Sequence, residues 1–156
     1  MLRAGQAAPL FALPDADMEM VSLADFRDQS NVVLYFYPKD DTPGCTREAI
    51  DFSDLESEFS ELRTTVLGVS RDDCLSHGAF RDKHGLAVCL LSDADSEVCE
   101  KYGVLQEKEI EGVRRVGVSR STFIIDRQGV LRHVLYGIKA AGHAHEVLDL
   151  VRRMKK

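Results

Sequence analysis

The sequence predicts an α/β domain in which one central sheet carries helices on both faces. Three runs, VVLYFY at 32–37, TTVLGVS at 64–70 and AVCLLSD at 87–93, have the continuous hydrophobicity of strands covered on both sides. Helical patterns separate these runs, and a predicted hairpin and helix follow them. The length of 156 residues fits a single domain spanning 1–156.

The first predicted element is a short hairpin within residues 11–23, FALPDADMEMVSL, with Pro14 and the segment from Asp15 to Asp17 in its turn. After the strand at 32–37, Thr42 and Pro43 are the preferred cap and first residue of a helix. Apolar residues then recur at intervals of three and four over 49–62, which predicts one helix with a single buried stripe.

Later elements also carry start and stop signals. Asp72 and Asp73 are suited to cap the helix after the second strand, which Gly85 would end, and Asp95 or Ser96 would begin a short helix after the third. Residues 121–126 and 130–137 flank the tripeptide RQG and predict a late hairpin. Residues 143–156 predict a terminal helix with basic residues in its last turn.

Composition limits the classes of partner. A net charge of −6 disfavours nucleic acid and anionic membrane surfaces as ligands. We find neither an apolar run long enough to span a membrane nor a secretory signal at the start of the sequence, so a cytoplasmic location is expected.

Four cysteines are the main source of chemistry: Cys45, Cys74, Cys89 and Cys99. Their spacing contains no C-x-x-C and no zinc-finger pairing. In a reducing compartment a functional cysteine is expected to be catalytic or redox-active rather than part of a disulfide framework. Cys89 and Cys99 fall in apolar surroundings and are expected to be core residues.

Cys45 has an unusual local setting. With Thr42 as cap and Pro43 first, Cys45 is the third residue of the predicted helix. Free backbone N–H groups and the positive end of the helix dipole stabilise an anion there, so the thiolate form is favoured. Gly44 leaves the neighbouring backbone open. The arrangement predicts a nucleophilic thiol.

The residues around Cys45 also carry a family signature. Pro38, Thr42 and Cys45 form the Pro-x-x-x-Thr-x-x-Cys pattern, and the sequence resembles peroxiredoxins of the peroxiredoxin Q or bacterioferritin comigratory protein branch. The likeness extends through LGVSRDD, LLSDADSEVCEKYGV, SRSTFIID and AGHAHEVL, which is almost the whole chain. It implies a thioredoxin-like fold, with a central mixed sheet and an N-terminal β-hairpin, and no metal or organic cofactor.

The resemblance implies a role for five residues. Cys45 would attack the peroxide and become a sulfenic acid, and Arg120 would hold the thiolate and polarise the peroxide. The hydroxyl of Thr42 would bond the sulfur and the peroxide oxygen, Pro38 would shield the pocket from water, and Glu48 would orient the arginine. Without the resemblance, the sequence is also consistent with Arg120 and Glu48 as solvated surface charges and with Thr42 as a helix cap.

One part of the family pattern is missing. The two usual positions of a resolving cysteine hold Ile50 and Arg81. The resemblance therefore implies either a one-cysteine cycle, with thioredoxin, glutaredoxin or glutathione as reductant, or resolution by another cysteine, for which Cys74 is the best candidate. Peroxiredoxin Q proteins also favour a monomer.

Other classes fit less well. A cysteine phosphatase needs an arginine six residues after the nucleophile, where this chain has Asp51. A cysteine protease would use a histidine and leave Arg120 and Thr42 unexplained. His143 and His145 do not share a helical face and are poor metal ligands. The remaining alternative is a thioredoxin-fold redox sensor or holdase that is oxidised stoichiometrically, without turnover.

Overall fold

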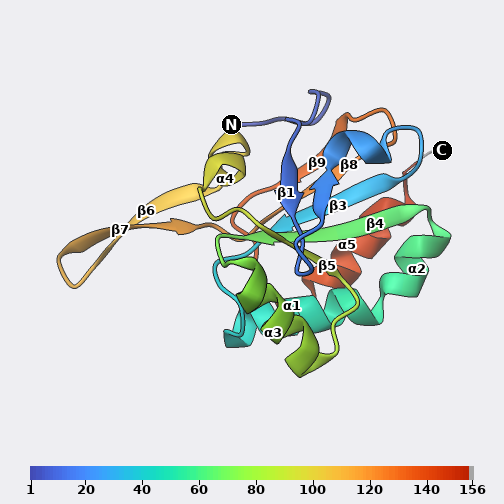
Figure 1. The fold of residues 1–156 in the computed structure, drawn as a ribbon. Helices are drawn as coiled ribbons and strands as arrows, with labels where there is room; N and C mark the ends of the chain where they lie inside the picture. Colours follow the sequence, from blue (N-terminus) through green and yellow to red (C-terminus); the bar gives the residue numbers. More distant parts are fainter. Residues whose placement is uncertain (155–156) are drawn as a thin grey trace.

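The centre of the molecule is a five-stranded mixed sheet, shown in Figure 1. The computed structural model describes residues 1–154. Strands β3, β4 and β5 are parallel, β8 is antiparallel to β3 and β9, and the spatial order is β5-β4-β3-β8-β9. The strand bounds are β3 (Asn31–Phe36), β4 (Thr64–Ser70), β5 (Cys89–Ser92), β8 (Ser121–Ile125) and β9 (Leu131–Leu135).

Helices cover both faces of this sheet, as the sequence predicts. One face carries the helices α1 (Pro43–Asp54), α2 (Glu56–Glu61), α3 (Cys74–His84) and α5 (His143–Arg152). The other carries the hairpin β1 (Ala12–Pro14) and β2 (Met20–Ser22), the 3₁₀ turn η1 (Leu23–Phe26) and the helix α4 (Glu97–Lys101). Two apolar cores result, one on each side of the sheet. Successive residues of β3 point to opposite cores, so Leu34 packs in the core beside β1 and α4, and Tyr35 packs in the core beside α1.

Three predicted boundaries need correction. Pro14 is the last residue of β1 and not part of the turn, where Asp15 instead accepts the N–H groups of Asp17 and Glu19. The helix predicted through 49–62 is two helices that meet at Leu55, whose N–H is shared among several carbonyls. The second of them, α2, packs against β4. The terminal helix α5 ends at Arg152; Lys155 and Lys156 lie outside the described residues.

Two helix starts also differ in detail from the prediction. Asp73 does cap α3, accepting the N–H of Ser76 at 2.8 Å, whereas Asp72 bonds elsewhere. The helix α4 begins after Ser96, as predicted, but the Ser96 side chain makes no capping hydrogen bond. The two oxygens of Asp93 instead accept the N–H groups of Val98 and Cys99. A buried acid that follows β5 therefore supplies the side-chain cap of α4.

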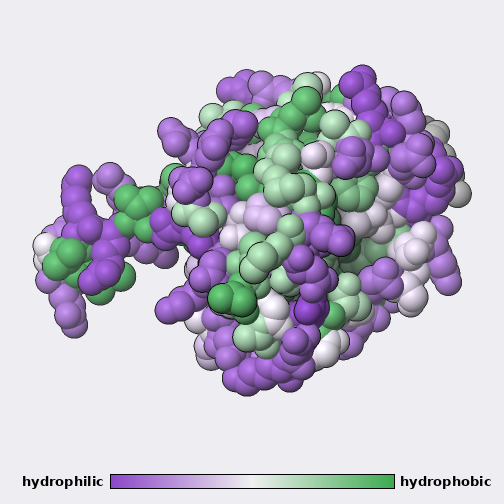
Figure 2. Space-filling model, viewed as in Figure 1, coloured by the Kyte–Doolittle hydropathy of each residue, from purple (hydrophilic) through white to green (hydrophobic). Residues whose placement is uncertain are grey.

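The sequence analysis misses one hairpin altogether. Strands β6 (Leu105–Ile110) and β7 (Val113–Val118) pair only with each other and project from the body, as Figures 1 and 2 show. Most of their side chains are exposed, so neither strand has the alternating pattern of a half-buried strand. The two-residue turn at Glu111 and Gly112, both with positive φ, is the signal that could have revealed it.

Candidate active site

The helix α1 brings Cys45 to the carboxyl end of β3. The chain leaves β3, passes through a short loop and enters α1 with Thr42 as cap and Pro43 as first residue, so Cys45 is the third helical residue, as predicted. The Cys45 side chain is 1% exposed and packs in the core beneath α1, with Tyr37, Ala49 and Phe52 in the same cluster. A thiol in this place is shielded from solvent and lies at the anion-stabilising end of a helix.

Arg120 reaches the same point from a distant part of the chain. It immediately precedes β8, whose first residue pairs with the last residue of β3, so the sheet itself brings Arg120 beside the start of α1. Its Nη2 donates to the Cys45 Sγ at 3.3 Å, and its Nη1 donates to Glu48 Oε1 at 2.6 Å. A Cβ on Gly44 would lie 3.3 Å from Nη2, so the glycine gives the guanidinium room to approach. The arginine is not a solvated surface charge.

Glu48 is fully buried one turn after Cys45. Burial raises the pKa of its carboxyl to about 7, although the neighbouring Arg120 acts in the opposite direction. For Arg120, burial lowers the pKa, but Glu48 and Cys45 outweigh it and raise the value overall. The second oxygen of Glu48, Oε2, has no hydrogen-bond partner. The acid and the guanidinium form a buried pair that fixes the orientation of the guanidinium beside the sulfur.

Thr42 and Pro38 lie on the loop that precedes Cys45. The Thr42 hydroxyl donates to the carbonyl of Lys39 at 3.0 Å, so it does not make the predicted capping hydrogen bond. The loop turn accounts for this difference, because it brings the Lys39 carbonyl within reach of the hydroxyl. Pro38 directly follows the last buried tyrosine of the strand region and is exposed.

His143 is a buried residue that the sequence analysis considered only as a metal ligand. It begins α5, and its Nε2 lies 2.7 Å from the Thr122 Oγ1 on β8, while its ring meets Phe52 of α1 edge-on. Burial and then the charge of Arg120 lower the pKa of His143 to about 4, so the ring is neutral at physiological pH. No local sequence pattern signals the contact of His143 with Phe52, because it forms only when α5 packs against α1.

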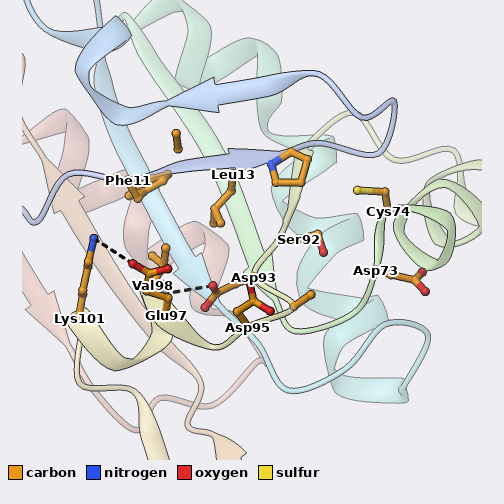
Figure 3. A pocket seen from close by; sticks show the side chains of 13 residues that line it. Phe11, Leu13, Asp73, Cys74, Ser92, Asp93, Asp95, Glu97, Val98 and Lys101 are labelled. Carbon is orange, nitrogen blue, oxygen red and sulfur yellow. Dashed lines mark hydrogen bonds and ion pairs between the residues drawn. The ribbon is translucent and has the colours of Figure 1, made fainter.

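Cys74 faces a different part of the molecule from Cys45. It is the first residue of α3, is partly exposed, and lines a cavity of about 450 Å³ between β1 and α4. Figure 3 shows its sulfur directed from the start of α3 toward this cavity, whose other walls include Leu13 and Lys101. Cys45 belongs to the core cluster beneath α1. The structure therefore does not bring these two thiols together.

The remaining cysteines are poor nucleophiles. Burial, aided by Asp15 and Asp17, raises the pKa of Cys89 to about 11, and burial with a hydrogen bond to Asp93 raises that of Cys99 further. Cys99 is a core residue as predicted; Cys89 packs against the same core but is partly exposed. All four cysteines are free thiols.

Neither a metal centre nor a membrane span is found among residues 1–154. No three His, Cys, Asp or Glu side chains of this range come together as metal ligands. None of the helices in the same range combines the length and apolar character needed to cross a bilayer.

Comparison with known proteins identifies the family. Residues 4–134 match the AhpC/TSA family. A putative peroxiredoxin bcp of Coxiella burnetii is 46% identical over 147 residues, which are 94% of this chain and 97% of that protein. A mutant of Xylella fastidiosa PrxQ is 35% identical with a TM-score of 0.92, over 97% and 96% of the two chains.

A third relative is described by the reaction that it carries out. The Xanthomonas campestris bacterioferritin comigratory protein, described for its alkyl peroxide reduction activity, is 36% identical with a TM-score of 0.88. The match covers 94% of this chain and 98% of that one. The chain therefore belongs to the AhpC/TSA family, as a peroxiredoxin of the peroxiredoxin Q or bacterioferritin comigratory protein branch, and is a thiol-dependent peroxidase.

Proposed function

We propose that Cys45 is the peroxidatic cysteine and that Arg120, Thr42, Pro38 and Glu48 form its site. The hydrogen bond from Arg120 Nη2 to the Cys45 Sγ, at 3.3 Å, carries this assignment. The guanidinium and the helix start place positive charge beside the sulfur, where the proposed reaction needs an anionic nucleophile. Residues 1–156 act as one domain.

The proposed reaction uses the electrons of the thiolate. The sulfur attacks the terminal oxygen of the peroxide, a new S–O bond forms and the O–O bond breaks. Cys45 becomes a sulfenic acid, and the departing oxygen takes up a proton to leave as water or as an alcohol. Arg120 stabilises the charge that moves onto the departing oxygen, and Glu48 holds Arg120 in place. Pro38 limits access of water. The Thr42 hydroxyl gives up its bond to the Lys39 carbonyl when it turns toward the peroxide.

The substrates are hydrogen peroxide and organic hydroperoxides. Alkyl peroxide reduction by the Xanthomonas campestris relative supports the second class. Peroxide consumption in the presence of a thiol reductant tests the proposal: many peroxides reduced per chain are expected for each class. Consumption that stops after one equivalent would instead identify a sensor or holdase.

The reductant is an external thiol, namely thioredoxin, glutaredoxin or glutathione. Ile50 and Arg81 occupy the usual resolving positions, and Arg81 is engaged with Asp17. A disulfide requires Cα atoms within about 7 Å, so Cys74 could resolve Cys45 only if the start of α3 unwound. The chain acts as a monomer in the cytoplasm, where a reducing environment suits its free thiols.

Peroxide treatment without added thiol tests this one-cysteine cycle. We expect the intact protein to gain the mass of one oxygen, because no second thiol faces Cys45. The Cys74→Ser variant should behave like the natural protein, with equal turnover when an external thiol is supplied. A Cys45–Cys74 bridge that dominates the peptide map, formed as fast as the sulfenic acid, would contradict external resolution while leaving the peroxidase reaction intact.

Glu48 gives the fold a measurable pH dependence. Its pKa is about 7 in the folded protein against 4.5 when unperturbed, so the protonated form is favoured by folding. This stability is fully present below pH 4.5 and is lost as pH rises toward 7. The difference in free energy of unfolding, Glu48→Gln minus natural protein, should therefore increase by about 1 kcal/mol per pH unit between pH 4.5 and 7. Above pH 7 this difference should become constant.

Denaturant unfolding at several pH values measures this difference. Asp54→Asn is the matched control, since Asp54 lies on the same helix but is exposed. Its curve should run parallel to that of the natural protein. A Glu48→Gln curve that is also parallel would show that the Glu48 carboxyl is not shifted.

A further inference from the structure

A second buried polar cluster lies outside the reacting groups. It consists of Tyr37 and Asp40, from the loop before Cys45, and Ser76 and His77 from α3; we call it the Asp40 cluster. Asp40 Oδ1 accepts the Tyr37 hydroxyl at 2.6 Å. Asp40 Oδ2 accepts the Ser76 hydroxyl at 2.8 Å and lies 2.7 Å from His77 Nδ1. The side chains of Asp40 and His77 are only 4% and 0% exposed.

Every polar atom of the central pair is engaged. His77 Nε2 lies 2.9 Å from the carbonyl of Leu91 on β5, and because a carbonyl can only accept, Nε2 carries a proton. Burial, with nearby Tyr35 and Asp40, raises the pKa of Tyr37 well above its usual value, so Tyr37 remains a donor. The contact between His77 Nδ1 and Asp40 Oδ2 completes the cluster. Buried networks that are fully satisfied in this way hold their members in one arrangement.

The cluster determines the path of the loop before Cys45. The backbone N–H of Asp40 donates to Asp72 Oδ2 at 2.8 Å, so the loop is held through its backbone as well as through the Asp40 side chain. Ser70 donates to the same Asp72 oxygen, which ties this anchor to the end of β4. The next residue, Asp41, has a positive φ, and there the chain turns into the catalytic helix. Asp40 therefore sits at the point where a small movement would displace the loop.

The residues that flank Asp40 belong to the proposed site. Pro38 lies two residues before it and Thr42 two residues after, and the Thr42 hydroxyl bonds within the same loop. We infer that Asp40 and His77 are positioning residues of the peroxidase, which hold the loop from α3 so that Pro38 and Thr42 enclose the peroxide beside Cys45. This inference rests on the proposed function, because it assigns the loop a part in the reaction at Cys45.

Two substitutions of His77 separate positioning from simple packing. An asparagine amide can take the place of Nδ1 and keep the bond to Asp40, whereas a glutamine amide reaches the place of Nε2 and keeps the bond to Leu91. If the Asp40 contact matters, His77→Asn should preserve function and His77→Gln should not. If His77 only stabilises packing between α3 and β5, the order should be reversed or the two should be equal.

Two reactions of Cys45 provide the measurement. Oxidation by hydrogen peroxide needs the loop in place, whereas alkylation by chloroacetamide needs only an accessible thiolate. We expect His77→Gln to lower the peroxide rate by ten- to a hundredfold, in line with the effect of misplacing a reacting group by about 1 Å, with alkylation changed no more than about threefold. His77→Asn should keep both rates within about threefold.

His84→Gln is the matched control. His84 lies on the same helix and its Nε2 contacts Asp41 of the same loop at 2.9 Å, but this pair is exposed and should contribute little. Tyr37→Phe, which removes one hydroxyl from the cluster and keeps the ring, serves if His77→Gln does not fold; its ratio of peroxide to alkylation rate should also fall.

The outcomes are distinct. Unchanged rate ratios in the folded His77→Gln and Tyr37→Phe proteins, or an equal loss in His77→Asn and His77→Gln, would overturn the positioning role. Failure of the proposed function looks different, because the natural protein itself would then show no rapid oxidation of Cys45.

Discussion

Replacing Cys45 with serine is expected to abolish peroxide consumption, the largest effect of any single substitution in this chain. A serine hydroxyl is a weak nucleophile without an adjacent base. The groups that surround the position, Arg120 and the helix start, favour an anion but do not accept a proton. Removing the sulfur therefore removes the electron pair that breaks the O–O bond.

The measurement is peroxide consumption with a thiol reductant present. Cys89→Ser is the control, because Cys89 is partly buried at the start of β5 and has a raised pKa, so the variant should keep the natural rate of the first oxidative step. Turnover by Cys45→Ser at the natural rate would refute the assignment of the nucleophile. Either conclusion requires that the Cys45→Ser variant is folded. We expect it to fold, because the substitution changes the side-chain volume only slightly.

The sequence predicts the fold well where side chains are buried. The runs at 32–37 and 64–70 become β3 and β4 because strands covered on both faces are apolar throughout. The hairpin of β6 and β7 is missed for the same reason: it projects into solvent and buries almost nothing, so hydrophobicity does not mark it. Only its turn, with positive φ at Glu111 and Gly112, leaves a signal.

For the site, the sequence predicts what is local and the family resemblance supplies what is not. The helix start at Thr42 and Pro43 can be read from neighbouring residues. The approach of Arg120 from 75 residues away depends on the pairing of β3 with β8, which no local pattern contains. The Asp40 cluster is hidden in the same way, since His77 meets Asp40 only when α3 packs beside the loop.

The contact between Arg120 and Cys45 leads to the second large effect. Arg120→Met introduces an apolar side chain of similar length and removes the donor that lies 3.3 Å from the sulfur. Loss of one preorganised donor typically costs about 10²–10³-fold in rate, and we expect a loss of that order in the oxidation of Cys45.

Stopped-flow oxidation of Cys45 by hydrogen peroxide measures this loss of rate. Arg132→Met on β9 is the control, since Arg132 is partly exposed and its ion pair with Asp126 is long, at 3.7 Å. Arg120→Lys should fall between the natural protein and the methionine variant, because an ammonium keeps the charge but cannot contact Cys45 and Glu48 through one rigid fork.

The Arg120→Met substitution also leaves Glu48 buried without its partner. The carboxyl can then remain only as the neutral acid or at a cost in stability, so a slow reaction in the single variant could reflect a disturbed α1. The double variant with Glu48→Gln removes the unpaired acid and should recover stability without recovering the rate. A double variant that oxidises at the natural rate would show that Arg120 does not assist the reaction of Cys45 and serves only to pair the buried acid.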